Sequence, residues 1–259
     1  MQAVGPEMMA RTVGPGRRLA YRIVATVLGL SVVGLSLPFT IASFVNEEDA
    51  IHRMHNVNGL IGFGSLIGVL LLVSAWRPEE HLAAIHVVAA AALAGVIAGV
   101  MSGDLIDGGW LVAPIAVIVV WALHPSRPDL FRLREPTLSL IALSVLATIP
   151  GIAWALTQSE LQRSGVPAVD QHAEFHHYSS MAAAGITLPL VGIAAAFAAR
   201  GARFARWFVG ASASALGLAS LGLSDHVGAF DTLWAWALVG GGVLYIVLAE
   251  VTGPKAVPA

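Results

Sequence analysis

The stretch DAIHRMHNVNG, Asp49–Gly59, stands where one long apolar segment ends and the next begins. It carries Asp49, His52 and His55, which follow one another at steps of three residues. On a helix such residues share one face, so their side chains point the same way. A polar face at the boundary of two apolar segments predicts a site at the end of a helix.

A related stretch, DQHAEFHHYSS, returns later in the chain and indicates a duplicated unit. A third match joins MSGDLIDGG to LSDHVGAFD. Three ionisable pairs share the offset of 121 residues: Asp49 with Asp170, His55 with His176, and Asp104 with Asp225. We expect both copies to keep a polar site built from these residues.

Composition places the chain in a membrane. Of the 259 residues, 57% are hydrophobic and only 12% are charged, and the mean hydropathy is +0.78. Soluble domains carry about 25% charged residues, so an integral membrane protein is expected, with the lipid bilayer as its main partner. The net charge of −2 argues against a nucleic-acid partner. The absence of cysteine excludes disulfides, thiolate metal sites and iron–sulfur clusters.

Eight apolar segments approach the roughly 20 residues that cross a bilayer. They lie near 19–45, 56–76, 82–102, 109–124, 137–157, 177–199, 204–224 and 231–251, and the fourth is the shortest. The expected fold is an all-α polytopic membrane protein made of two tandem, parallel four-helix repeats. Its parts are a tail (1–18), the first repeat (19–124), a linker (125–136), the second repeat (137–251) and a tail (252–259). A long loop, TQSELQRSGVPAVDQH, is expected between the fifth and sixth segments.

The charges predict an orientation. All of the 14 Lys and Arg residues except Arg53 and Arg163 fall on one side of the eight expected segments. By the positive-inside rule, that side and both termini are cytoplasmic, in a multi-pass protein of the plasma membrane. Ten of the 16 acidic residues fall on the opposite, external side, together with six of the histidines.

The external histidines have the chemistry of a metal or haem site. Neutral imidazole binds iron, copper or zinc, and a nearby carboxylate ligates the metal or fixes the ring tautomer. The second half is the better candidate for haem ligation by two histidines, His176 or His177 with His226. The candidate metal ligands are His52, His55, His172, His176, His177 and His226. The candidate catalytic residues, which would orient the metal ligands or relay protons, are Asp49, Asp104, Asp170 and Asp225.

Other interpretations of these residues stay open. A single histidine or acid at a helix boundary is at least as often a solvated interface residue, with Asp49 and Asp170 as helix caps. Arg53, beside His52, is expected to bind a haem propionate, or equally Glu48 or a lipid phosphate.

The architecture resembles the heme A synthase-like family. Eight segments form two parallel halves, and Glu48 precedes the pair His52–Arg53 at the outer start of the second segment. The resemblance implies a four-helix bundle around a haem in each half, with haem modification as an activity. The spacing from Glu48 is one residue longer than the family pattern. The family also has haem ligands on its fourth and eighth helices, whereas the outer part of the fourth segment has no histidine here and His226 precedes the eighth.

We therefore expect a membrane redox protein that holds haem b or a transition metal at its external face. Its partner would be a membrane quinone or a respiratory protein. Three alternatives remain: a transporter of metal cations or small solutes, a metal-dependent hydrolase, and a non-catalytic subunit.

Overall fold

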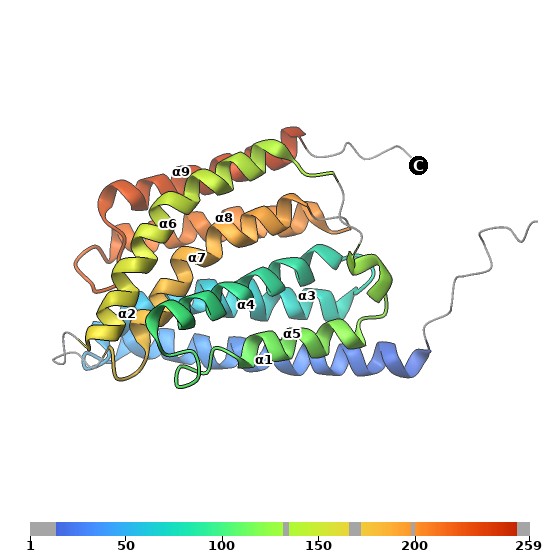
Figure 1. The fold of residues 1–259 in the computed structure, drawn as a ribbon, viewed down its shortest axis with the longest axis horizontal. Helices are drawn as coiled ribbons and strands as arrows, with labels where there is room; N and C mark the ends of the chain where they lie inside the picture. The colour runs from blue at the N-terminus through green and yellow to red at the C-terminus, as the bar shows by residue number, and fades with distance from the viewer. Residues whose placement is uncertain (1–13, 132–134, 166–171, 198–199, 253–259) are drawn as a thin grey trace, which may run out of the picture.

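The computed structural model describes residues 14–131, 135–165, 172–197 and 200–252, and these residues contain helices and turns but no strand. Seven helices are long and apolar enough to cross a membrane (Figure 1). They are α1 (Pro15–Val45), a continuous helix over Ala50–Trp76, α4 (Leu82–Ser102), α6 (Leu138–Ser164), α7 (His177–Ala196), α8 (Ala202–Gly222) and α9 (Thr232–Thr252). The expected all-helical architecture with several apolar helices of membrane-spanning length is therefore present in the described residues.

The second spanning helix changes its winding along its length. It starts as the 3₁₀ turn η2 (Ala50–His52), continues as α2 (Arg53–Gly59) and the π-helical segment η3 (Leu60–Val69), and ends as α3 (Leu70–Trp76). It packs closely on α1, where a Cβ added to Gly29 would stand 2.8 Å from the carbonyl oxygen of Gly68. Glycines at this crossing allow the two backbones to approach, as is common between membrane helices.

The fourth expected segment contains a helix shorter than the others, α5 (Val112–Leu123). Its 12 residues extend about 18 Å, less than the hydrocarbon thickness of roughly 30 Å. The turn before it folds back onto α4, because the indole ring of Trp110 lies where a Cβ on Gly95 or Gly99 would stand. At its other end, Arg17 at the start of α1 donates to the carbonyl oxygen of His124 (2.7 Å). A short 3₁₀ segment, η4 (Arg127–Phe131), follows.

The helices divide into a centre and a periphery. In the most apolar stretch of α7, 72% of the residues are buried, against 17% in α1 and 22% in both α6 and α9. Helix α7 therefore forms the middle of the bundle, while α1, α6 and α9 present much of their surface to the surroundings. Helices α6 and α7 touch through backbone at Gly151 and Gly185, where a Cβ on either glycine would clash with the carbonyl oxygen of the other.

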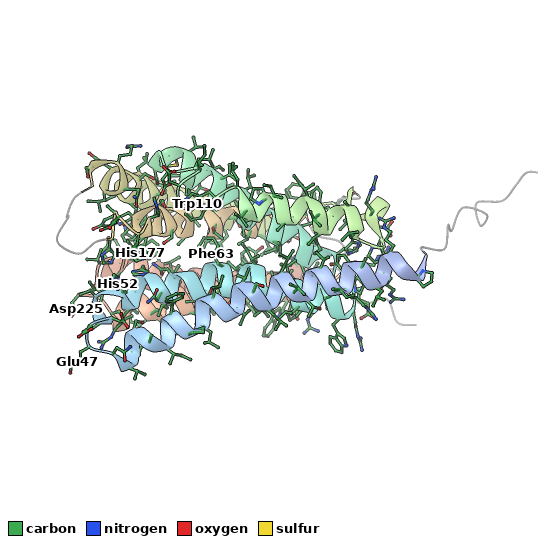
Figure 2. All side chains as sticks on the ribbon, turned by 90° about the horizontal axis from the view of Figure 1, so that it is seen from below. Glu47, His52, Phe63, Trp110, His177 and Asp225 are labelled. Atoms are coloured by element: carbon green, nitrogen blue, oxygen red, sulfur yellow. The ribbon has the colours of Figure 1, made fainter. Side chains whose placement is uncertain are left out.

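Charged residues lie at the two ends of the bundle. One end carries the ion pairs Arg18–Glu79 (3.0 Å), Arg200–Asp129 (2.6 Å) and Arg203–Glu250 (2.8 Å). The opposite end carries Glu47, His52, His177 and Asp225, as Figure 2 shows. The bundle thus separates a basic end from an end that is rich in acids and histidines.

Helix α6 differs from the expectation in its length. It continues to Ser164, through the residues SELQRS that the sequence analysis assigned to a loop. Leu161 and Gln162 are half-buried, so this last part of α6 is packed against the rest of the bundle. The extension matters for the site, because Gln162 reaches the turn before α7.

Candidate metal centre

Four histidines come together at the acidic end of the bundle. Each of His52, His55, His172 and His177 offers a ring nitrogen, and these four nitrogens lie within 4.8 Å of one another. Two come from the start of the second spanning helix and two from the turn that leads into α7. Figure 2 shows His52 and His177 close together at the end of the bundle that lies away from the start of α1. We call these four residues the histidine cluster.

The first pair follows from the local winding of the chain. His52 closes the 3₁₀ turn and His55 lies in the first turn of α2, so the step of three residues brings both rings to one face. Their ring centroids are 4.9 Å apart. This is the shared face that the spacing predicts.

The second pair depends on a turn that α6 supports. The amide of His177 donates to the carbonyl oxygen of His172 (2.8 Å), which closes the turn over the intervening residues. The side-chain amide of Gln162, near the end of α6, donates to the carbonyl oxygen of Ala173 (2.7 Å). Its oxygen accepts a hydrogen bond from the amide of Ser179 (3.3 Å). Gln162 therefore ties both sides of the turn to α6.

The histidine cluster is compact and mostly buried. The rings of His55 and His177 stack with centroids 3.8 Å apart, and His172 lies 5.1 Å from His52 and 5.2 Å from His55. His172 is fully buried and His55 is 6% exposed. The Nδ1 atom of His55 is buried without a hydrogen-bond partner. Buried polar atoms are nearly always satisfied, so this nitrogen points to a missing ligand.

Four imidazoles can hold one transition-metal ion. Imidazole nitrogen suits zinc, copper, iron and nickel, at about 2.0–2.1 Å for zinc. Four nitrogens at that distance in a tetrahedron stand roughly 3.4 Å apart. The observed limit of 4.8 Å is wider than this by an amount that small side-chain rotations can close. Four protein ligands would fill a tetrahedral coordination shell.

His176, which the 121-residue offset singled out, does not belong to the histidine cluster. Its backbone has a φ of +59°, the left-handed conformation, and it is the only non-glycine residue with positive φ in the described chain. Its Nδ1 lies 3.1 Å from Oδ2 of Asp104, a carboxylate that is almost buried. Asp104 therefore pairs with the histidine that points away from the cluster.

His226 also lies outside the histidine cluster among the residues that the structure describes. Its Nδ1 is 2.9 Å from Oδ1 of its neighbour Asp225, whose side chain is 86% exposed. The hydrogen bond from His226 lowers the pKa of Asp225. The expected pairing of His226 with His176 or His177 across a haem stays a prediction, and in the structure His176 and His226 each lie next to a carboxylate.

The remaining candidates have local partners. The Nε of Arg53 donates to the carbonyl oxygen of Ser43 (2.8 Å), at the end of α1, and its guanidinium lies over the ring of Phe44. Asp49 precedes the 3₁₀ turn without a capping bond from its side chain, and its Oδ2 accepts from Asn46 (3.0 Å). Asp170 falls outside the described residues.

Sequence reasoning missed Gln162 as part of the site. The residue lies in a stretch assigned to a loop, and nothing in its spacing links it to the turn that it holds. A prediction that the helix continues through SELQRS would have placed Gln162 near the turn.

Comparison with protein-family models, curated proteins and solved structures gives no match for this chain. The function is therefore argued from the chemistry of the histidine cluster and from its place in the bundle.

Proposed function

We propose that this is an integral membrane redox protein that holds one copper or iron ion in the histidine cluster at its external end. The observation that carries the proposal is the convergence of His52, His55, His172 and His177 within 4.8 Å. Structural zinc sites are usually built with cysteine, which this chain lacks, whereas imidazole also suits copper and iron. A redox-active ion is therefore preferred to structural zinc.

The origin of the four histidines supports one metal site shared by the two halves of the chain. Two histidines come from the first half of the chain and two from the second. The helix starts also correspond: Leu82 of α4 to Ala202 of α8, and Val112 of α5 to Thr232 of α9, both 120 residues apart. His52 and His172 have the same separation of 120 residues. We propose that the halves are tandem repeats, and that the metal lies where they meet.

A metal ion fits the histidine cluster better than haem does. Axial imidazoles bind opposite faces of a porphyrin, but the rings of His55 and His177 stack at 3.8 Å. The other ring centroids within the cluster are 4.9–5.5 Å apart. These rings leave no gap for a porphyrin between them, so we propose the transition-metal form of the redox centre rather than haem b.

The site also argues against two of the alternatives. A hydrolytic metal needs an open coordination position for water, whereas four histidines fill a tetrahedral shell. A cation transporter usually has ionisable groups at mid-membrane depth. In the described spans such residues occur only near helix ends. Electron transfer needs neither an open coordination position nor ionisable groups at mid-membrane depth. The proposed electron-transfer partner is a membrane quinone or a respiratory protein.

The proposed setting is the plasma membrane, with the basic end of the bundle in the cytoplasm. The ion pairs of Arg18, Arg200 and Arg203 all lie at that end, which also holds the start of α1 and the end of α9. By the positive-inside rule both termini are then cytoplasmic and the histidine cluster is external.

The test is metal content and spectroscopy of the purified protein. We expect about one copper or iron per chain, with an electron paramagnetic resonance or absorption signal that changes on reduction. His55→Ala should lose the metal, because it removes a buried ligand. His226→Ala is the matched control, since this histidine lies at the same end but outside the cluster, and it should keep the metal. A wild-type protein without metal, after growth in copper and iron, would refute the proposal.

A further inference from the structure

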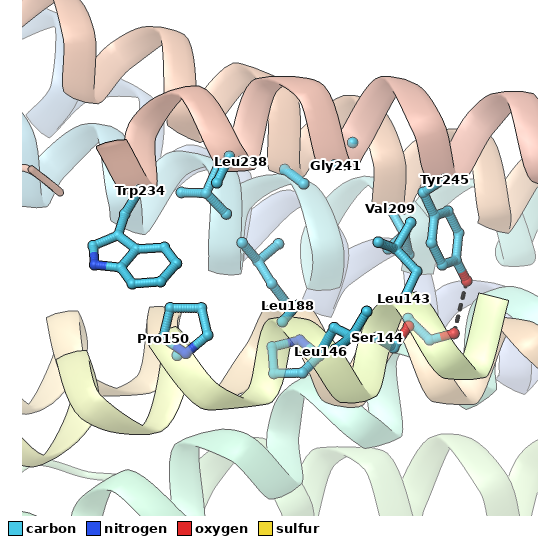
Figure 3. A pocket seen from close by; sticks show the side chains of 18 of the residues that line it. Leu143, Ser144, Leu146, Pro150, Leu188, Val209, Trp234, Leu238, Gly241 and Tyr245 are labelled. Atoms are coloured by element: carbon cyan, nitrogen blue, oxygen red, sulfur yellow. Dashed lines mark hydrogen bonds between the residues drawn. The ribbon is translucent and has the colours of Figure 1, made fainter. Parts of the chain in front are cut away.

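A second feature lies apart from the histidine cluster, among the last four helices. A cavity of about 330 Å³ lies between α6, α7, α8 and α9 and is open on one side. Figure 3 shows it between α9 and α6, bordered by Pro150, Leu188, Trp234 and Tyr245. We call it the α6–α9 cavity. Its volume is within the range of small-molecule binding pockets, roughly 300–1,000 Å³.

The α6–α9 cavity is bounded by side chains that face outward from the bundle. Leu146 and Ile149 on α6 are 63% and 70% exposed, and Trp234 on α9 is 39% exposed. All three border the cavity. Because α6 and α9 are peripheral membrane helices, this border faces the acyl chains of the bilayer.

The wall of the α6–α9 cavity offers little to a polar ligand. The hydroxyl of Tyr245 donates to the carbonyl oxygen of Gly192 (2.7 Å; Figure 3), and that of Ser144 donates to Leu140 (2.8 Å). Most of the other lining residues are aliphatic, glycine or proline. A buried water needs two to four polar partners, and apolar cavities of about 150 Å³ stay dry and bind apolar molecules.

We propose that the α6–α9 cavity binds the hydrocarbon chain of a membrane lipid. Such chains surround the border of the cavity at this depth, and they need no hydrogen bonds from its wall. A transmembrane helix of a second copy, about 10–12 Å wide with its side chains, is the alternative occupant, and the labelling experiment distinguishes it from a lipid chain. The lipid site is independent of the metal centre.

The glycines of α9 supply a matched pair of variants. A Cβ on Gly241 meets no atom within 4 Å, and Gly241 lines the α6–α9 cavity, so Gly241→Leu fills the space with little clash. A Cβ on Gly240 is equally free, but Gly240 is exposed and does not line the cavity. Ala237→Leu, at the border, is a second filling variant should Gly241→Leu fail to fold.

The experiment uses the full chain in nanodiscs that contain a phospholipid with a diazirine in its acyl chain. After irradiation, peptides of α6 and α9 are analysed by mass spectrometry. We expect labelling at the cavity residues in the wild type and in Gly240→Leu, and at least a fivefold loss in Gly241→Leu or Ala237→Leu. Metal content should stay unchanged in all of them.

Two results would overturn the proposal. One is equal labelling of the wild type and both filling variants, which would mean that lipid only touches the outer surface. The other is a wild-type dimer that Gly241→Leu converts to a monomer, with no cavity labelling in either state. In that case a second copy of the chain, and not a lipid, covers the cavity.

Discussion

Adjacent residues His176 and His177 have different partners, and the backbone explains why. His176 takes the left-handed conformation and directs its ring to Asp104, whereas His177 begins α7 and joins the histidine cluster. The carbonyl oxygen of His176 accepts from the hydroxyl of Ser179 (2.8 Å), which helps to hold this turn. One position along the chain thus separates a member of the histidine cluster from a residue that pairs with a carboxylate.

The first prediction distinguishes these two histidines. His177→Ala should lose the metal. His176→Ala should keep it but lower the free energy of unfolding by roughly 1–3 kcal/mol, because the nearly buried Asp104 loses its partner. For a chain of this size that corresponds to about 2–4 °C in Tm for each kcal/mol. Metal analysis and thermal unfolding in detergent measure both effects, and loss of metal in His176→Ala would contradict the assignment.

The repeat offset in the sequence pairs the histidines differently from the way the structure groups them. All four members of the histidine cluster were candidates, yet the offset of 121 paired His55 with His176. In the structure the cluster pairs differ by 120 residues (His52 and His172) and by 122 (His55 and His177). A positive φ on a histidine has no signature in the sequence, so the direction of His176 could not be predicted.

A second prediction concerns His124, in the turn after α5 at the basic end. Burial lowers the pKa of His124 to about 4, and Arg17 acts in the same direction. The ring is fully buried, and its Nδ1 accepts from the amide of Ser126 (3.0 Å). In the unfolded chain His124 takes up a proton near pH 6.5, whereas in the folded chain it does so only near pH 4. The contribution of His124 to the free energy of unfolding is therefore fully present above about pH 6.5. It is lost as the pH falls toward 4, by up to roughly 1.4 kcal/mol per pH unit.

Thermal unfolding between pH 7.5 and 4 measures this loss. His124→Gln removes the titrating group, and its Tm should fall less steeply over the same range. Ser126→Ala changes a neighbouring residue that does not titrate and keeps the amide that donates to His124, so its pH profile should remain that of the wild type. Parallel profiles for His124→Gln and the wild type would show that other groups cause the loss.

At the scale of the elements, most spans could be predicted and their junctions could not. The segments 82–102 and 231–251 agree with α4 and α9 to within one residue at each end, because apolar runs bounded by polar residues define them. Helix α6 instead runs to Ser164, well beyond the expected 157, because polar residues continue the helix outside the apolar core. Hydropathy detects the part in lipid and is silent about the part beyond it.

The third prediction tests whether this extension of α6 holds the site. Gln162→Met keeps the size of the side chain but removes the bonds to Ala173 and Ser179. We expect metal affinity to fall about tenfold, as is common when groups that orient metal ligands are removed. Glu160→Gln, an exposed change on the same turn of α6, is the control and should leave affinity unchanged. Competition with a metal-sensitive dye measures the affinities. Equal affinities for both variants would show that Gln162 does not support the site.

At the scale of the whole molecule, the charged residues and the histidines lie toward the ends of an apolar bundle. The histidine cluster joins residues more than 100 positions apart, so only the complete fold assembles it. Composition and hydropathy predict such a membrane bundle. They do not predict that two histidines of the cluster come from each half of the chain, because that depends on how the second spanning helix lies against α7.

The fourth prediction concerns the number of membrane crossings, and it depends on α5. Helix α5 is too short to span the membrane by itself. Its last carbonyl oxygens accept hydrogen bonds from Arg17, at the start of α1. Helix α4, which precedes it, ends near Arg163 at the opposite end of the bundle. The turn over 104–111 therefore covers part of the distance. We expect α5 with this turn to make an eighth crossing, which leaves both termini on one side.

Single cysteines provide the measurement, because the chain has none of its own. With a membrane-impermeant maleimide on intact cells, Glu47→Cys and Asp107→Cys should react, whereas Glu80→Cys and Arg127→Cys should react only after permeabilisation. The pair Asp107→Cys and Arg127→Cys flanks α5 and decides the result. Reaction of both from outside would mean that α5 does not cross. The second half would then be inverted relative to the first, and His172 and His177 could not lie on the same side of the membrane as His52 and His55, so the shared metal centre would also fail.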